Sequence, residues 1–175
     1  MDAVIVDTNV IVIANDTDDK RKDCRDHCQD RLRQIIDQRG KVVIDDRRRI
    51  LGEYQNNTRP NTRKGVGDIF VKRLLQNLGN PEICTMVSIT SLTGNGTDFE
   101  EFPTDTALIN FDPDDRKFIA VALAHKRDNG QVPPILLAID RGWLQSIAAL
   151  ANHGVSVDLI CEEDMQHPRQ GRKGK

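Results

Sequence analysis

Two acidic residues follow apolar runs of the sequence and could bind a metal ion. Asp7 comes directly after the β-branched run at 3–6, and Asp140 follows the apolar run at 135–139. In an open α/β sheet, the functional site lies at the carboxyl ends of the strands. The two aspartates are therefore predicted to lie near each other, where carboxylates can act as metal ligands or as acid–base groups.

Asp115 lies in the first turn of an apolar helix predicted at 114–127. Asp112 precedes Pro113 and is a residue type favoured at the N-cap, so it is the predicted N-cap of this helix. Acids in a first turn also stabilise a helix without any catalytic role. Because this helix is predicted to be buried and to begin beside the strand ends, Asp115 is favoured as a functional group. Asp112 is favoured as a cap.

Glu53 is the fourth candidate acid. It lies in a helix predicted at 47–56, about two turns beyond Asp45. Its spacing from Arg49 equally favours an exposed i, i+4 ion pair. The presence of the other acids favours a functional role.

Four carboxylates brought together repel one another unless a cation neutralises them. A hard divalent ion suits an all-oxygen site, and Mg²⁺ binds through a few carboxylates, water and substrate phosphate. Such an ion activates bound water and stabilises charge on phosphoryl oxygens, which is the chemistry of phosphodiester hydrolysis. These four acids are therefore candidate ligands of a Mg²⁺ or Mn²⁺ ion: Asp7, Glu53, Asp115 and Asp140.

The elements that must position these residues alternate along the chain. Strands are predicted at 3–6, 41–44, 86–90, 135–139 and 155–160, and helices at 20–38, 47–56, 66–78, 114–127 and 143–152. Such alternation is typical of a parallel sheet with helices on both faces. The segment 91–108, which is rich in Thr, Gly and acids, is predicted to be a loop.

One domain is predicted at 1–165, followed by a basic, disordered tail at 166–175. A chain of 175 residues with 38% hydrophobic content can bury one core, and no Pro-, Gly- or Ser-rich linker divides it. The formal net charge of −2 excludes attraction of nucleic acid by bulk charge. Local charge must therefore decide any such binding.

The four cysteines lie in a chain with no recognisable secretory leader and no apolar run near the roughly 20 residues of a membrane span. We therefore expect a reducing, cytoplasmic location and no membrane contact. Cys24, His27 and Cys28 could suggest a metal cluster, but no second ligand pair follows at zinc-finger or zinc-ribbon spacing. They are interpreted as ordinary residues of a charged helix.

A basic segment surrounds and follows Glu53, with six basic residues and one acid between Arg47 and Lys64. A polyanion held near an acidic site requires cationic surface. A solvated charged face is the alternative interpretation. Substrate contacts are expected from this segment and from a polar residue beside Asp7: Asn9, Arg49, Arg59, Arg63 and Lys64.

In the order of its motifs, the chain resembles PIN-domain nucleases, the family that includes VapC-type toxins and stand-alone RNases. The motifs are VDTN at 6–9, LGEY at 51–54, DDRKFIAVA at 114–122 and AIDRGW at 138–143. The resemblance implies a three-layer α/β/α sandwich with a central, mainly parallel sheet of about five strands. It also implies a metal-dependent endoribonuclease whose acidic cluster, named above, is supported by Asn9 or Thr8.

Two positions depart from the family pattern. Gly142 stands where many relatives carry an acid or Asn, and Arg116 stands where some carry an acid. The number of metal ions therefore stays open, as does the choice of ligand among Asp112, Asp114 and Asp115. The resemblance further implies RNA as substrate and, for a toxin, an antitoxin or other protein partner and a homodimer.

Two other functions compete with this interpretation. A haloacid-dehalogenase-like phosphatase also has an aspartate after its first strand, but it needs an acid where Asn9 stands. A catalytically silent PIN-like module would bind RNA or a protein partner, and its acids would serve as caps and surface charges. Cleavage of RNA would distinguish the nuclease from the silent module.

Overall fold

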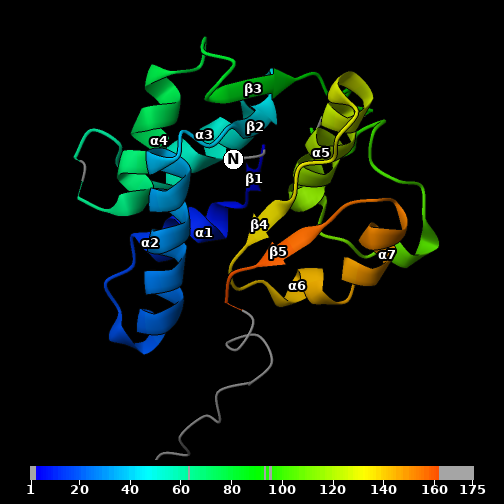
Figure 1. The fold of residues 1–175 in the computed structure, drawn as a ribbon. Coiled ribbons are helices and arrows are strands. Elements are labelled where there is room, and N and C mark those ends of the chain that lie inside the picture. The colour runs from blue at the N-terminus through cyan, green and yellow to red at the C-terminus, as the bar shows by residue number, and fades with distance from the viewer. Residues whose placement is uncertain (1–2, 63, 93, 95, 162–175) are drawn as a thin grey trace, which may run out of the picture.

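Parallel strands lie at the centre of the chain in the computed structural model, which describes residues 3–62, 64–92, 94 and 96–161 (Figure 1). The strands are β1 (Ile5–Val6), β2 (Val42–Asp45), β3 (Cys84–Val87), β4 (Ile135–Leu137) and β5 (Val157–Leu159). The α-helices are α1 (Thr8–Ala14), α2 (Lys22–Asp37), α3 (Arg49–Asn57), α4 (Val66–Gln76), α5 (Arg116–Asn129), α6 (Arg141–Leu144) and α7 (Ile147–Asn152). Short 3-10 helices are η1 (Asp19–Arg21), η2 (Thr106–Leu108) and η3 (Pro113–Asp115). The predicted α/β class is thereby confirmed.

The strands form two parallel sheets, one in the order β1-β4-β5 and the other a β2-β3 pair. A single parallel bridge between Val4 and Val42 links the two sheets. At this bridge the Val4 amide donates to the Lys41 carbonyl, and the Val43 amide donates to the Val4 carbonyl, both at 2.9 Å. Because all these pairings are parallel, the carboxyl ends of β1 and β4 lie at the same edge.

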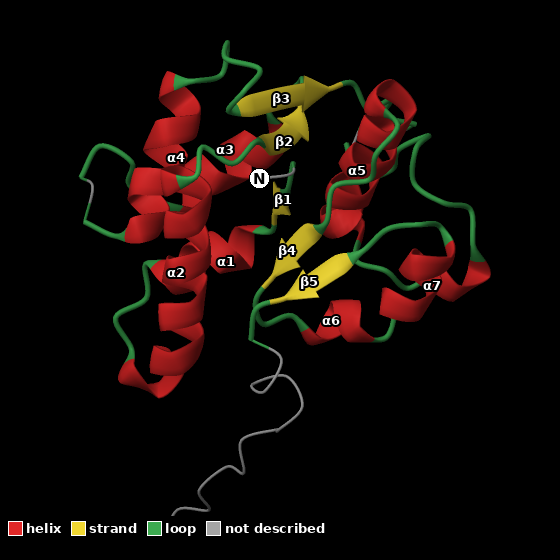
Figure 2. Cartoon of the chain, viewed as in Figure 1, coloured by secondary structure: helices red, strands yellow, loops and turns green. Residues whose placement is uncertain are grey.

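Helices lie on both sides of the strands. Figure 2 shows α1, α2 and α4 to one side and α5, α6 and α7 to the other. The residues of β1, β2 and β4 are all buried. Continuous burial is what a parallel strand covered on both faces requires, and it explains why these segments are apolar apart from Asp45 at the end of β2.

The main departure from the predicted elements is α1, which sequence patterning did not anticipate. Its run of Val and Ile residues is typical of a strand. Asp7 overrides this preference as the N-cap, since its Oδ1 accepts the Asn9 amide at 2.9 Å. The helix predicted at 143–152 is likewise divided, because Asp140 caps an earlier start at Arg141 and forms the separate helix α6.

Asp45 connects the end of β2 to the start of α3. Its fully buried carboxylate accepts the amides of Arg49 and Ile50, each at 2.9 Å. We expect Asp45→Ala to lower the free energy of unfolding by about 2 kcal/mol, because a cap is lost and buried amides are left unpaired. The neighbouring Asp46 is exposed, so Asp46→Ala should change it by less than about 0.5 kcal/mol. Urea denaturation of both variants checks this, and equal losses would contradict the capping role.

A disulfide joins Cys24 of α2 to Cys161, which follows β5. Cys28 is also buried, and burial raises the pKa of its thiol to about 12. The interpretation of Cys24 and Cys28 as ordinary helix residues missed this juxtaposition, because their partner lies 137 residues away in the sequence.

Within the described residues, the helices are too short or too polar to cross a bilayer. The cytoplasmic location stays a prediction. The tail predicted at 166–175 lies outside the described residues.

Candidate functional site

Asp7 is the most buried of the four predicted site acids and lies where β1 ends and α1 begins. Only 2% of it is exposed. Its amide donates to the Leu136 carbonyl of β4 at 2.9 Å, and its Oδ1 accepts the Asn9 amide. Asp7 is thereby fixed by both the neighbouring strand and the helix that it caps.

Asp140 lies at the same sheet edge, three residues beyond the end of β4. Its Oδ1 accepts the Gly142 amide at 2.8 Å. The side-chain amide of Asn9 donates to Asp140 Oδ2 at 3.4 Å. Asn9 thus contacts both aspartates, and the predicted convergence of the two strand ends is observed.

Asp115 approaches this pair from the start of α5. The indole of Trp143, a buried residue of α6, donates to Asp115 Oδ2 at 2.8 Å. Asp112 is exposed and caps η3 by accepting the Asp114 amide at 2.9 Å, as its position in the sequence predicted. Of the three neighbouring aspartates, Asp115 is the one that raises the pKa of Asp7.

Glu53 reaches the site from α3. Its Oε2 lies 2.6 Å from Nζ of Lys117, and its side chain is 33% exposed. Arg49, the predicted alternative partner of Glu53, instead forms an ion pair with Asp45 at 3.4 Å. Glu53 therefore faces α5 and the other acids.

Burial and neighbouring acids raise the pKa of Asp7 and of Asp115. Burial is the main cause that raises the pKa of Asp7 to about 8, and repulsion from Asp115, Asp140 and Glu53 acts in the same direction. The hydrogen bond from the Asn9 amide lowers this pKa. Burial also raises the pKa of Asp115 to about 6. Repulsion from Asp140 acts in the same direction, and the hydrogen bond from Trp143 lowers this pKa. Asp7 and Asp115 are therefore harder to ionise than free aspartates, and a neutralising cation would favour their charged forms.

A buried hydroxyl beside Asp7 lacks a partner. Thr8 is 6% exposed, and its Oγ1 has no hydrogen-bond partner among the described residues. An unpaired buried hydroxyl is costly, and contact with an ion or a water molecule is the usual way in which such a group is satisfied. The carboxylates offer only oxygen donors, the kind that a hard divalent cation prefers, but among the described residues no three of the carboxylates each bring an oxygen atom within 4.8 Å of one another.

Lys117 is a site residue that sequence reasoning missed. It is 8% exposed, pairs with Glu53 and donates to the carbonyl of Asp114. Its Nζ also lies 4.7 Å from the ring centroid of Phe118. The sequence did contain a signal for this pairing, which was a lysine beside the apolar stretch of a helix predicted to be buried. A buried lysine almost always has a partner.

We expect Lys117→Met to destabilise the metal-free protein by about 1–2 kcal/mol, because Glu53 loses its partner and Asp115 loses a charge that lowers its pKa. Added Mn²⁺ should then raise the melting temperature more than it does in the wild type, because no ammonium competes for Glu53. Thermal denaturation in EDTA and in Mn²⁺ measures both effects. Lys126→Met, an exposed change on α5, is the control. A smaller Mn²⁺ effect in Lys117→Met would contradict this competition.

The predicted substrate-binding residues lie in different places. Asn9 lies within the acidic site, whereas the Arg49 guanidinium is held between Asp45 and the ring of Phe99, 5.5 Å from the ring centroid. Arg59 and Lys64 are exposed and line a pocket of about 330 Å³. Arg63 lies outside the described residues.

This pocket includes Asn15, the C-cap of α1, while Asp7 is the N-cap of the same helix. Asp7 and Asn15 are eight residues apart at the two ends of this helix, which separates their backbones by roughly 12 Å at 1.5 Å per residue.

Comparisons of the chain with protein-family models, with curated proteins and with solved structures find no match.

Proposed function

We propose that this chain is a Mg²⁺- or Mn²⁺-dependent endoribonuclease of the PIN-like type. The observation that carries the proposal is the convergence on the buried Asp7 of three acids from other segments, Glu53, Asp115 and Asp140, each of which raises its pKa. Clustered carboxylates of this kind are stable in the ionised form when a divalent cation neutralises them. Phosphodiester hydrolysis is the reaction that such a site suits best.

The arrangement of the strands supports a PIN-like fold. Taken together through the Val4–Val42 bridge, the strands follow the order β3-β2-β1-β4-β5. We infer one five-stranded parallel sheet between two layers of helices, as the resemblance implies. The acids lie at the carboxyl edge of this sheet, where ligands bind in open α/β folds.

The residues that would hold the ion are Asp7, Glu53, Asp115 and Asp140. When bound, the ion would lower the pKa of a coordinated water and offset charge on the phosphoryl oxygens.

Two side chains position the carboxylates. Asn9 restrains Asp140, and the Trp143 indole restrains Asp115, each through a hydrogen bond to one carboxylate oxygen. The other Asp115 oxygen stays available, and such supporting contacts commonly orient metal ligands. The Lys117 ammonium orients Glu53 and provides a positive charge that would favour an anionic substrate.

The exposed Arg59 and Lys64 support nucleic acid as the substrate, because cations about one α1 length from the acids could bind flanking phosphates. RNA is proposed over DNA on the resemblance alone. A toxin role, an antitoxin or other protein partner and a homodimer stay predictions.

One observation favours a catalytically silent module that binds RNA or a protein. Glu53 is already paired with Lys117, and Asp115 already accepts the Trp143 indole, so the cluster is partly neutralised without a metal ion. Such a protein would bind RNA without cleaving it.

The test is incubation of the purified protein with labelled single-stranded RNA in Mn²⁺ and in EDTA, with single-stranded DNA of matched sequence alongside. We expect RNA cleavage in Mn²⁺ and none in EDTA. Cleavage that survives chelation would contradict the metal mechanism. Binding without cleavage in either condition would favour the silent module, and preferred cleavage of DNA would contradict the choice of RNA.

A further inference from the structure

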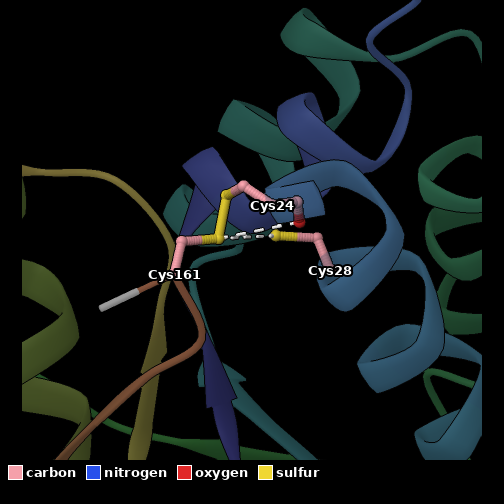
Figure 3. Close-up of side chains that lie close together, drawn as sticks. All are labelled: Cys24, Cys28 and Cys161. Atoms are coloured by element: carbon pink, nitrogen blue, oxygen red, sulfur yellow. Dashed lines mark hydrogen bonds between the residues drawn. A yellow bond between two sulfur atoms is a disulfide. The ribbon is translucent and has the colours of Figure 1, made fainter. Parts of the chain in front are cut away.

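Three cysteine side chains from two distant parts of the chain meet in the core (Figure 3). Cys24 and Cys28 are four residues apart on α2, so they share one helix face, and Cys161 lies two residues beyond the end of β5. They are 1%, 0% and 4% exposed, and their sulfur atoms all lie within 4.8 Å of one another. None of these cysteines belongs to the acidic site.

The sulfur of Cys28 is not needed for the disulfide between Cys24 and Cys161. It nevertheless lies 3.8 Å from the sulfur of Cys161. Two thiolates bound to one metal ion at the usual Zn–S distance of about 2.3 Å are separated by roughly 3.8–4.0 Å. Cys28 and Cys161 therefore already have the spacing of two ligands of a common ion.

We propose that, once the disulfide is reduced, Cys24, Cys28 and Cys161 form a three-thiolate site for a thiophilic metal ion, with Cu(I) as the preferred occupant. Thiolates select soft ions such as Cu(I) and Zn(II) over hard ones. Structural Zn(II) sites require four ligands. The group formed by the described residues offers three, which suffices for Cu(I).

The start of α2 favours a negative charge on the sulfur of Cys24, whereas burial raises the pKa of the Cys28 thiol, so a bound metal ion must displace the Cys28 proton. Cys24 lies in the first turn of α2, where the positive end of the helix dipole stabilises a thiolate. The side chain of the N-cap residue, Arg21, makes no capping hydrogen bond.

The reaction balances in two steps. A dithiol reductant gives two electrons and two protons to the Cys24–Cys161 bond, which breaks into two thiols while the reductant becomes a disulfide. One Cu(I) ion then forms three Cu–S bonds, and the three thiol protons pass to solvent. Because the disulfide and the metal use the same sulfur atoms, each state excludes the other, and both join α2 to the segment after β5.

The test is anaerobic titration of the reduced full chain with Cu(I) against a chromogenic Cu(I) chelator. The variants are Cys28→Ser and Cys161→Ser, and Cys84→Ser is the matched control because Cys84 is another buried free thiol. We expect one Cu(I) per chain in the wild type and in Cys84→Ser, and at least about 10-fold weaker binding in the other two variants. X-ray absorption of the loaded wild type should show three sulfur neighbours.

A second measurement needs no variant. The oxidised wild type, with its disulfide intact, should not bind Cu(I) at this site. Equal binding by Cys28→Ser and Cys84→Ser, or equal binding by the oxidised and reduced wild type, would overturn the proposal. Zn(II) that binds the reduced protein as tightly as Cu(I) would overturn the choice of ion.

Discussion

Substitution of Asp7 by Asn is expected to reduce Mn²⁺-dependent RNA cleavage by at least about 100-fold. Loss of an outer-shell partner of a metal ligand typically costs 10–100-fold, and loss of a ligand itself should cost more. Asn keeps the shape of Asp and can still accept the Asn9 amide as a helix cap, so the fold should be retained. Initial cleavage rates at saturating Mn²⁺, with circular dichroism as a check of folding, measure the effect.

The neighbouring aspartates of η3 supply the matched controls. Asp115→Asn should lose cleavage comparably, because Asp115 repels Asp7 and so shares its site. Asp112→Asn should retain cleavage, because Asp112 is an exposed cap and Asn caps equally well. If Asp112→Asn lost as much activity as Asp115→Asn, the choice of Asp115 as the ligand would be wrong.

The same Asp7→Asn substitution should raise the free energy of unfolding of the metal-free protein, on the order of 4 kcal/mol at pH 7. The pKa of this carboxyl is ordinarily 3.8, as in the unfolded chain, and about 8 in the folded protein. The folded state therefore holds the proton more tightly, and stability from this group is present below pH 3.8 and lost as pH rises towards 8. From pH 3.8 to pH 7 is about 3 pH units, and each unit lowers the free energy of unfolding of the wild type by about 1.36 kcal/mol. Asn has no proton to lose.

Urea denaturation in EDTA across the range from pH 4 to pH 9 measures this effect. The two proteins should be similarly stable near pH 4, and the variant should gain its advantage progressively up to about pH 8. Asp46→Asn, an exposed change, should follow the wild type throughout. A constant difference between Asp7→Asn and the wild type at all pH values would show that ionisation of Asp7 does not cause it.

The juxtaposition of Asp7 and Asp140 could be predicted from the sequence because each follows a buried apolar run. Parallel strands end at one edge, so two residues 133 positions apart in the chain meet without any further information. Asp115 and Glu53 could be proposed in the same way, from helices that begin near that edge.

Helix α1 could not be predicted from its composition. Val10, Ile11 and Ile13 favour a strand locally, and the helix forms because Asp7 caps it and its apolar side chains are buried. Tertiary packing here overrides local propensity.

Two other features depend on contacts between segments that sequence patterns do not connect. The pairing of Lys117 with Glu53 requires α5 to lie against α3. The meeting of Cys28 with Cys161 requires the end of β5 to lie beside α2. Neither pair of residues belongs to a recognisable sequence motif, so both contacts are seen only in the structure.

The central claim is that Asp7 and the surrounding acids bind a divalent cation, and the number of protons released on binding tests it most directly. Calorimetric titration with Mn²⁺ at pH 7, in two buffers of different ionisation enthalpy, gives that number. Because the pKa of Asp7 in the metal-free protein is about 8, most molecules must lose this proton when the carboxylate binds the ion. We predict release of close to one proton by the wild type and none by Asp7→Asn. Binding of Mn²⁺ without proton release, or no binding at all, would contradict the claim.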